Sequence, residues 1–444
     1  MLQKIKKGQV SFQDAFSRMY PGNTFAIKDV TFCVTEECNL RCSYCYEVRK
    51  NNNRMTREVG EKTIDMLFEE YAKGGRYLNS ENSEGLILDF IGGEPLLEID
   101  LINHLVEYFK FKAISTNHPW ALKYMIAITT NGILYEQPKV QDFIERNKNN
   151  LSIGITIDGN KELHDSCRKF PNGAGSYDIV EKAVKIEVSK DTSPATKLTL
   201  APGNIAYLVD AFKNLVSLGL TSINANTVYE KGWNVDHAKI FYEQLKGLAD
   251  YMIDDGVVYD VYCSLFQDTL GKPIGDEDNK NWCGGTGLML AIDTKGNFYP
   301  CLRYLPFTLQ NDRKPMIIGN IYDGLEHTEE ETKCVDCLKC ITRKSQSTDE
   351  CFNCPIARGC AWCSGYNYDQ FGTPDKRATY ICVMHKARVM ANVYFWNKLY
   401  KLQGSPLKFK MNIPKEWALE IIDEKEYDML MEIQLEDAQI TPTV

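Results

Sequence analysis

The sequence predicts an α/β fold in which a partial (β/α)6 barrel is followed by a small cysteine-rich domain and a C-terminal helix. Two observations lead to this prediction. Throughout residues 28–255, short apolar runs rich in β-branched residues alternate with stretches whose apolar residues recur at helical spacing. After residue 255 the alternation ends, and cysteines at short spacings take its place.

The barrel is predicted from six pairs of a strand and a helix. The strands are expected at residues 30–35, 86–91, 124–129, 153–157, 197–200 and 223–228, and the helices at 56–71, 101–111, 140–144, 177–188, 205–218 and 238–253. Such alternation predicts a parallel sheet with crossover helices. Six pairs are two short of a closed barrel, so an open partial barrel and a doubly wound sheet are both compatible with it. In either fold the active site lies at the carboxyl ends of the strands.

Four segments are expected along the chain. They are an N-terminal segment at residues 1–27, the barrel at 28–255, the cysteine-rich domain at 256–385, and a C-terminal helix with an acidic tail at 386–444. The apolar periodicity of residues 389–399 predicts the C-terminal helix. The acidic stretch at 416–437 is more typical of a solvated helix than of a docking site.

Composition excludes several classes of partner. The formal net charge of −9 argues against nucleic acid, because phosphate neutralisation needs a basic face. No apolar run is long enough to span a membrane, and no hydrophobic stretch follows the N-terminal lysines, so neither a membrane nor a signal peptide is expected. We expect a cytoplasmic protein whose sixteen cysteines stay reduced, and clustered cysteines there indicate metal more often than disulfides.

The first cysteine motif is Cys38, Cys42 and Cys45, which follows the first predicted strand directly. A structural 4Fe–4S cluster takes four thiolates, whereas three leave one iron open for a ligand that reacts. A zinc knuckle lacking its fourth ligand, or three reduced thiols, is the alternative explanation of the motif taken alone.

Polar motifs follow the next three strands as well. Gly92-Gly93-Glu94-Pro95 allows close approach of a ligand to the backbone and offers carbonyl and carboxylate acceptors for an ammonium group, unless it is a plain turn. Thr130 and Asn131 supply a hydroxyl and an amide, although an ordinary Asn-Gly turn has the same sequence. Asp158 ends the fourth strand, and Arg168 could hold a carboxylate or lie in solvent. The convergence of these motifs at the carboxyl ends of the strands is stronger evidence for an active site than any single motif.

These motifs together resemble those of the radical S-adenosylmethionine enzymes, over residues 28–255. The resemblance implies that three cysteines hold a 4Fe–4S cluster, to which S-adenosylmethionine binds and is reductively cleaved to a 5′-deoxyadenosyl radical. It places Tyr44 near the adenine, Thr156 and Asp158 near the ribose, and Arg168 near the methionyl carboxylate. The full set of expected cofactor-binding residues is Tyr44, Gly92, Gly93, Glu94, Pro95, Thr130, Asn131, Thr156, Asp158 and Arg168.

The second half of the chain has its own cysteine pattern. A β-hairpin is expected at 289–301, and the cysteines around and after it are Cys283, Cys301, Cys351, Cys354, Cys360, Cys363 and Cys382. Zinc ribbons are one explanation. The order also resembles the SPASM extension of radical enzymes that modify peptides, which implies one or two auxiliary 4Fe–4S clusters. By that resemblance Cys351, Cys354, Cys360 and Cys382 hold one cluster, and Cys283, Cys301 and Cys363 the other.

The pattern departs from the family in three ways. The spacing from Cys360 to Cys363 is one residue short, and residues 284–287 lack the extra cysteine that often follows the first. The second cluster is therefore expected to have three protein ligands and an open iron. In addition, Cys334, Cys337 and Cys340 could supply the missing ligand, bind zinc, or form a further site.

The resemblance implies a peptide or protein substrate and an electron donor such as flavodoxin or ferredoxin. Sulfatase maturases carry an Asp directly after the cysteine that matches Cys301, but here Leu302 and Arg303 follow. We therefore favour a maturase of ribosomal peptides that forms a thioether or C–C crosslink over formylglycine formation. Residues 1–27 are too short for the leader-binding domain of many such maturases, so residues 386–444 are the alternative recognition element. A non-catalytic electron carrier or zinc scaffold is the hypothesis of another class.

Overall fold

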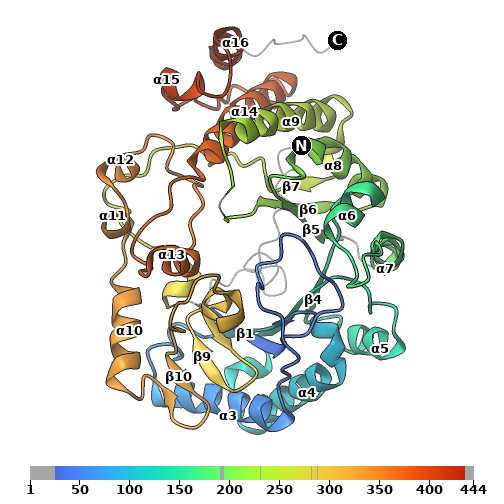
Figure 1. Cartoon of the computed structure of the whole chain (residues 1–444), viewed down its shortest axis with the longest axis vertical. Helices are drawn as coiled ribbons and strands as arrows, with labels where there is room; N and C mark the ends of the chain where they lie inside the picture. Colours follow the sequence, from blue (N-terminus) through green and yellow to red (C-terminus); the bar gives the residue numbers. More distant parts are fainter. Residues whose placement is uncertain (1–25, 191–194, 231, 282, 288, 436–444) are drawn as a thin grey trace.

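The computed structural model describes residues 26–190, 195–230, 232–281, 283–287 and 289–435 (Figure 1). Most of the expected N-terminal segment and the last residues of the expected acidic tail lie outside this part of the chain. Within it, no helix is long and apolar enough to cross a membrane.

A parallel sheet forms the first half of the chain (Figure 1). Its strands are β1 (Ile27–Thr35), β2 (Gly85–Gly92), β3 (Tyr124–Thr130), β4 (Leu151–Thr156), β5 (Ala195–Leu200), β6 (Ser222–Thr227) and β7 (Tyr262–Cys263). They lie side by side in sequence order. The six predicted strands are confirmed, and their uninterrupted order indicates the partial barrel rather than a doubly wound sheet, in which the order reverses. The short strand β7 was not predicted.

The cysteine-rich half continues this same sheet. The predicted hairpin is present as β8 (Met289–Ile292) and β9 (Asn297–Tyr299), and β8 pairs in parallel with β1. The short strands β10 (Gly319–Asn320) and β11 (Gly324–Leu325) extend it further. Among the described residues the sheet thus has eleven strands, with β1 in its interior between β2 and β8.

Crossover helices follow the outer side of the curved sheet (Figure 1). They are α3 (Arg57–Lys73), α4 (Ile99–Ser115), α5 (Pro138–Asn147), α6 (Lys161–Cys167), α7 (Tyr177–Lys190), α8 (Leu208–Ser217) and α9 (Val235–Asp254). Thr56 caps α3 as predicted, because its side chain accepts the N–H of Val59. The apolar periodicity located six of these helices, whereas the short α6 was not predicted.

Helices of the second half complete the fold. They are α10 (Glu329–Lys339), α11 (Arg343–Gln346), α12 (Asp349–Phe352), α13 (Ser364–Phe371), α14 (Cys382–Leu402), α15 (Lys415–Ala418) and α16 (Glu424–Leu435). The predicted C-terminal helix is confirmed as α14, which packs along α9 of the barrel (Figure 1). The acidic stretch is not wholly solvated, because Leu430 of α16 is fully buried in the same core.

A buried amide joins α14 to the barrel. Asn392 Oδ1 accepts the backbone N–H of Gln267 at 2.9 Å and the indole N–H of Trp396 at 3.2 Å, and its Nδ2 donates to the carbonyl of Leu265 at 3.0 Å. The N–H groups of Gln267 and Trp396 would lose this partner if the amide were removed, and each unpaired buried group costs about 1–3 kcal/mol. The carbonyl of Leu265 would keep its hydrogen bond from Arg388 Nε.

Asn392→Ala is therefore expected to lower the free energy of unfolding by about 2–5 kcal/mol, measured by chemical denaturation. The control is Asn149→Ala, which removes an exposed amide and is expected to change it by less than about 0.5 kcal/mol. Equal stability of the two variants would show that α14 is not fixed through this amide.

Candidate functional site

The three cysteines of the first motif lie on the loop that leaves the carboxyl end of β1. Cys38 is 8% exposed, and its Sγ accepts the N–H of Leu40 at 3.4 Å. Lys50 Nζ lies 3.4 Å from the Sγ of Cys45. Burial raises the pKa of the Cys38 thiol to about 11 and also raises that of Cys42. A nearby ammonium and a backbone donor act in the opposite direction, because they favour thiolates.

Two backbone hydrogen bonds hold this loop beside the segment that follows α6. The N–H of Arg41 donates to the carbonyl of Lys169 at 2.7 Å, and the N–H of Ser43 donates to that of Cys167 at 2.9 Å. Arg168 lies between the two acceptors. The bonds therefore fix the position of its guanidinium relative to the cysteines.

Gly92 and Gly93 bring the end of β2 against the cysteine loop. The N–H of Gly93 donates to Thr35 O at 3.0 Å, and that of Glu94 donates to Glu37 O at 2.9 Å. A Cβ on Gly92 would lie 2.3 Å from Thr35 O, and one on Gly93 2.2 Å from Glu37 O. The two glycines are thus required by the close approach of the protein's own backbone, and their contact with a ligand stays a prediction.

Glu94 joins the ends of β2 and β3. Its carboxylate accepts the hydroxyl of Thr130 at 2.6 Å, the N–H of Asn131 at 2.8 Å and the N–H of Leu96 at 3.1 Å. Burial raises the pKa of Glu94, and these donors oppose the rise. Glu94, Thr130 and Asn131 are brought together as predicted, but the carboxylate is occupied as a brace and does not present a free acceptor. Asn131 Nδ2 then donates to Asn39 Oδ1 at 2.7 Å within the cysteine loop.

Tyr44, Asp158 and Arg168 form a second buried group. Arg168 Nη1 donates to the Tyr44 hydroxyl at 2.8 Å, the hydroxyl donates to Asp158 Oδ2, and Nη1 lies 4.0 Å from the same carboxylate. Burial lowers the pKa of Arg168, but Tyr44 and Asp158 outweigh it and keep that pKa above its usual value. The Arg168 Nε is buried and has no hydrogen-bond partner within the described residues. Thr156 is also buried, at the end of β4 two residues before Asp158.

His164 supports this group from behind. It is fully buried, its Nδ1 accepts the backbone N–H of Asp158 at 3.3 Å, and its Nε2 lies 3.0 Å from the hydroxyl of Ser176. That hydroxyl donates to the carbonyl of Arg168 at 2.7 Å. The chain of contacts links the backbones of Asp158 and Arg168, and it requires a neutral imidazole. Burial, with Arg168 and Lys161 nearby, lowers the pKa of His164 to about 3.

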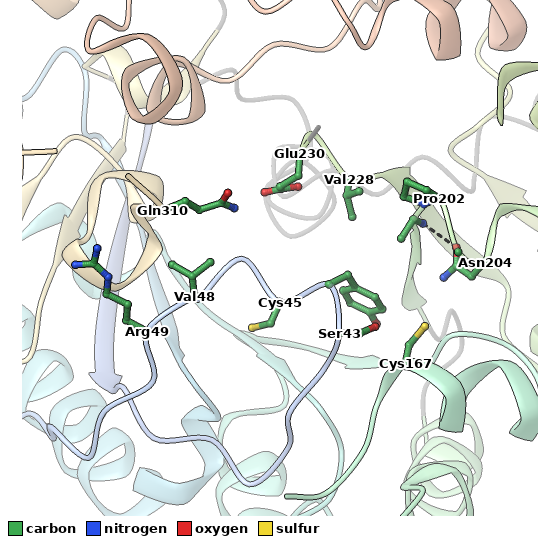
Figure 2. A pocket seen from close by; sticks show the side chains of 13 residues that line it. Ser43, Cys45, Val48, Arg49, Cys167, Pro202, Asn204, Val228, Glu230 and Gln310 are labelled. Atoms are coloured by element: carbon green, nitrogen blue, oxygen red, sulfur yellow. Dashed lines mark hydrogen bonds between the residues drawn. The ribbon is translucent and has the colours of Figure 1, made fainter. Parts of the chain in front are cut away.

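A cavity of about 670 Å³ opens beside these groups (Figure 2). It is lined by Ser43, Tyr44, Cys45, Val48, Arg49, Cys167, Ala201, Pro202, Gly203, Asn204, Val228, Glu230 and Gln310. These residues come from the cysteine loop, the end of α6, the segments after β5 and β6, and the cysteine-rich half. Of these lining residues, the sequence analysis predicted only Tyr44 and Cys45. The lining residues after β5 and β6 could have been found from their position directly after the end of a strand.

The later cysteines form two further sets. Cys283, Cys301 and Cys363 lie close enough that Cys363 and Cys283 add to the rise that burial causes in the pKa of Cys301. The Sγ of Cys283 lies 3.2 Å from the hydroxyl of Ser364. The structure therefore brings together the three residues expected to share a cluster.

Cys351, Cys354, Cys360 and Cys382 are the second set. Burial, followed by Cys360 and Cys351, raises the pKa of Cys382 to about 12, and Cys354 also contributes. This grouping matches the expected four-cysteine set.

The additional cysteines lie on or directly after α10. Cys334 is partly buried, whereas Cys337 and Cys340 are exposed. Whether these cysteines supply the missing ligand, bind zinc or form a further site stays a prediction.

None of the sixteen cysteines is in a disulfide in this structure. Among the residues that the structure describes, no three histidine, cysteine or acidic side chains form a group that could hold a single metal ion. The donors nevertheless suit the expected groups chemically. Three soft thiols on one loop fit an iron–sulfur cluster, and the unpartnered Nε of Arg168 fits the carboxylate of an amino acid.

Comparison with known proteins identifies the family. Residues 32–245 match the model of the Radical SAM superfamily. A protein of Methanocaldococcus jannaschii, MJ0907, is 31% identical over 46% of this chain and 64% of its own length. The radical SAM cyclopropyl synthase TigE of Paramaledivibacter caminithermalis is 23% identical, over 76% of this chain and 67% of its own length. A cysteine-type anaerobic sulfatase-maturating enzyme of Clostridium perfringens is 25% identical, over 79% of this chain and 91% of its own length. The match thus spans slightly less than two thirds of the first relative.

Solved structures share the fold. The chain superposes on anSMEcpe with bound AdoMet with a TM-score of 0.61 at 18% identity, covering 90% of this chain and 98% of that one. Its TM-score with Streptococcus suis SuiB bound to the precursor peptide SuiA is 0.54 at 12% identity, and the match covers 80% of this chain and 76% of SuiB. The chain contains a Radical SAM domain at residues 32–245, which is slightly less than half of its length. The resemblance of its second half to the SPASM-type maturases is confirmed as well.

His164 makes stability depend on pH. Its folded pKa of about 3 lies below the value of about 6.5 in an unfolded chain. The unfolded state therefore takes up a proton first as the pH falls, and the stabilisation present above pH 6.5 is lost between about pH 6.5 and 3. Between pH 7 and 5 the wild type is expected to lose about 2 kcal/mol more than His164→Gln, measured by urea denaturation. Parallel pH profiles for the two proteins would contradict this.

Gly93→Ala is expected to destabilise the fold by about 1–3 kcal/mol, because its Cβ would overlap the Glu37 carbonyl at the cysteine loop. Gly154→Ala on β4 is the matched control, since no atom lies within 4 Å of its added Cβ. Thermal and chemical denaturation of both variants tests this, and a Gly93→Ala protein as stable as the control would exclude the proposed close packing.

Proposed function

We propose that this enzyme cleaves S-adenosylmethionine reductively and modifies a side chain of a peptide or protein, with formation of a thioether or C–C crosslink. One observation carries the proposal. The CxxxCxxC loop contacts the Glu94 brace through Asn131 and the Asp158–Arg168 pair through Tyr44, and Tyr44 and Cys45 of this loop line the cavity. The family assignment sets aside the non-catalytic electron carrier and the zinc scaffold.

The residues present have distinct roles in this proposal. Cys38, Cys42 and Cys45 hold a 4Fe–4S cluster, and Arg168 receives the methionyl carboxylate through its unpartnered Nε. When bound, the cluster and S-adenosylmethionine supply a 5′-deoxyadenosyl radical that removes a hydrogen atom from the substrate. The protein positions both groups, and the bonds that join the loop to residues 92–94 and 167–169 keep that geometry rigid.

Auxiliary clusters are assigned to the two later cysteine sets. The four-cysteine set holds a fully ligated cluster, whereas Cys283, Cys301 and Cys363 leave one position for a further ligand. A substrate cysteine in that position would lead to a thioether. An electron donor such as flavodoxin or ferredoxin supplies the reducing electron, and the enzyme acts in the cytoplasm.

The substrate class rests on several relatives. TigE is named a cyclopropyl synthase, and SuiB was solved with a precursor peptide. Formylglycine formation is the second candidate, because sulfatase-maturating enzymes are similar over most of their length. Leu302 and Arg303 after Cys301 count against it, since the family's aspartate is replaced there.

The assay for the proposal is formation of 5′-deoxyadenosine. The anaerobically reconstituted, dithionite-reduced chain is expected to release it from S-adenosylmethionine, as measured by liquid chromatography and mass spectrometry. A Cys38→Ala, Cys42→Ala, Cys45→Ala variant is expected to release none but to retain iron at the later cysteines. A wild type that contains zinc alone and produces no 5′-deoxyadenosine would refute the proposed function.

A further inference from the structure

Lys50 is a largely buried cation beside the first cysteine motif. Its side chain is 14% exposed, and its Nζ donates to Cys45 Sγ at 3.4 Å. The same ammonium lies 3.2 Å from Glu47 Oε2, and the side chain of Glu47 is only 2% exposed. A carboxylate at this distance favours the charged form of the lysine. Lys50 is therefore a cation that offers an N–H donor to one of the three cysteine sulfurs.

The segment that follows the cysteine loop holds Lys50 in this position. Asn51 Nδ2 and Asn53 Nδ2 donate to Glu36 Oε2 at 2.8 and 3.0 Å, and the backbone N–H of Glu36 donates to the carbonyl of Asn53 at 2.9 Å. Glu36 is buried and directly follows β1, the strand that leads to the cysteine loop. The residue next to Lys50 is thus fixed to the same strand end as the cysteines, which keeps the ammonium and the sulfur in one frame.

Lys50 contacts Cys45 from outside the cavity. Cys45 lines the cavity, whereas Lys50 is not one of its lining residues (Figure 2). Arg168, by contrast, donates to Tyr44 and is assigned to the methionyl carboxylate of the ligand. Lys50 is therefore free to act on the sulfur while a ligand occupies the cavity.

We propose that Lys50 is a positioning residue that favours the one-electron reduction of the cluster held by Cys38, Cys42 and Cys45. The inference rests on the proposed function, which assigns that cluster, and deepens it. A positive charge and a hydrogen bond at a ligand sulfur stabilise the more negative, reduced state, and hydrogen bonds to the sulfurs are one of the factors that set the potential of such clusters. In the step, the electron donor of the proposed function gives up one electron, no bond forms or breaks, and Lys50 keeps its protons.

The Glu47 carboxylate provides a competing explanation, in which Lys50 only neutralises a buried charge. An unpaired carboxylate in such surroundings is unfavourable, so Lys50→Met alone leaves Glu47 without its cation. The double variant Glu47→Gln, Lys50→Met separates the two explanations. It has no unpaired charge at this place, but it also lacks the ammonium beside Cys45.

Redox titration monitored by electron paramagnetic resonance tests the proposal on the reconstituted full chain. The signal of the first site is identified as the one that changes when S-adenosylmethionine is added. Lys50→Met is expected to favour the oxidised form about tenfold, or 59 mV for one electron. The double variant is expected to shift in the same direction. Lys50→Arg is expected to stay close to the wild type, because a guanidinium is also a cationic donor.

The control is Lys73→Met, which is expected to leave the potential unchanged. Lys73 pairs with Glu70 at the same spacing of three residues and at 3.5 Å, but on the exposed surface of α3. A double variant that folds and has the wild-type potential would overturn the proposal, because Lys50 would then serve Glu47 alone. The double variant decides the question even if Lys50→Met fails to fold.

A second readout compares two reductants. With dithionite, Lys50→Met is expected to release 5′-deoxyadenosine more slowly than the wild type. With titanium(III) citrate, a stronger reductant, the two rates are expected to approach each other, because the variant differs only in its potential. A difference of the same size with both reductants would overturn the proposal, since it would indicate damage to the cysteine loop.

The two proposals fail in different ways. A wild type that has no signal sensitive to S-adenosylmethionine and forms no 5′-deoxyadenosine would overturn the proposed function and this inference together. A wild type that does both, with an unchanged potential in Lys50→Met and in the double variant, would overturn this inference alone.

Discussion

The pairing of β1 on both of its edges is the constraint on which the rest of the structure depends. On one edge β2 continues into backbone hydrogen bonds between residues 93–94 and the start of the cysteine loop. On the other edge, β8 begins the hairpin that leads to Cys301. One interior strand therefore positions the first cysteine motif, the strand-end turn beside it, and a cysteine of the second half. Such a strand has little freedom to shift, because a slip in register would move all three at once.

Burial of charge shapes the site as strongly as the sheet does. Glu94, Asp158 and Arg168 are all less than 9% exposed, and an unpaired charge in such surroundings would be very unfavourable. The Glu94 carboxylate is stabilised by three hydrogen-bond donors, and Asp158 and Arg168 are stabilised by each other and by Tyr44. The resulting groups are stiff, which preserves the cavity geometry. Arg168 Nε is the exception, and a free donor inside a rigid polar group is suited to an anionic ligand.

Local patterns were sufficient to predict the first half of the fold. Period-two and helical periodicities located β1 to β6 and their main helices, because each buries one face against the next element. Because active sites lie at the carboxyl ends of parallel strands, the polar residues that follow the strands were expected at one edge of the sheet. They are Glu94, Thr130, Asn131, Asp158 and Arg168. This expectation could not show that Glu94 is occupied by Thr130 and Asn131, since hydrogen bonds between different strands depend on register and side-chain direction. The junction of β8 with β1 was missed for the same reason, because a hairpin whose strands have four and three residues carries no signal for its neighbour.

The cysteine-rich half is a wall of the cavity as well as a holder of cysteines. Gln310 lines the cavity directly, and Arg303 reaches Glu230 from the segment that follows Cys301. A change in that half therefore alters the charge that a substrate meets. Arg303 stands where the sulfatase maturases carry the residue after their aspartate, so the same short segment that lacks their base supplies a cation instead. Glu230, at the strand end after β6, supplies the carboxylate that pairs with this cation. The pair cannot be inferred from either segment alone, because it follows from their contact in the folded chain.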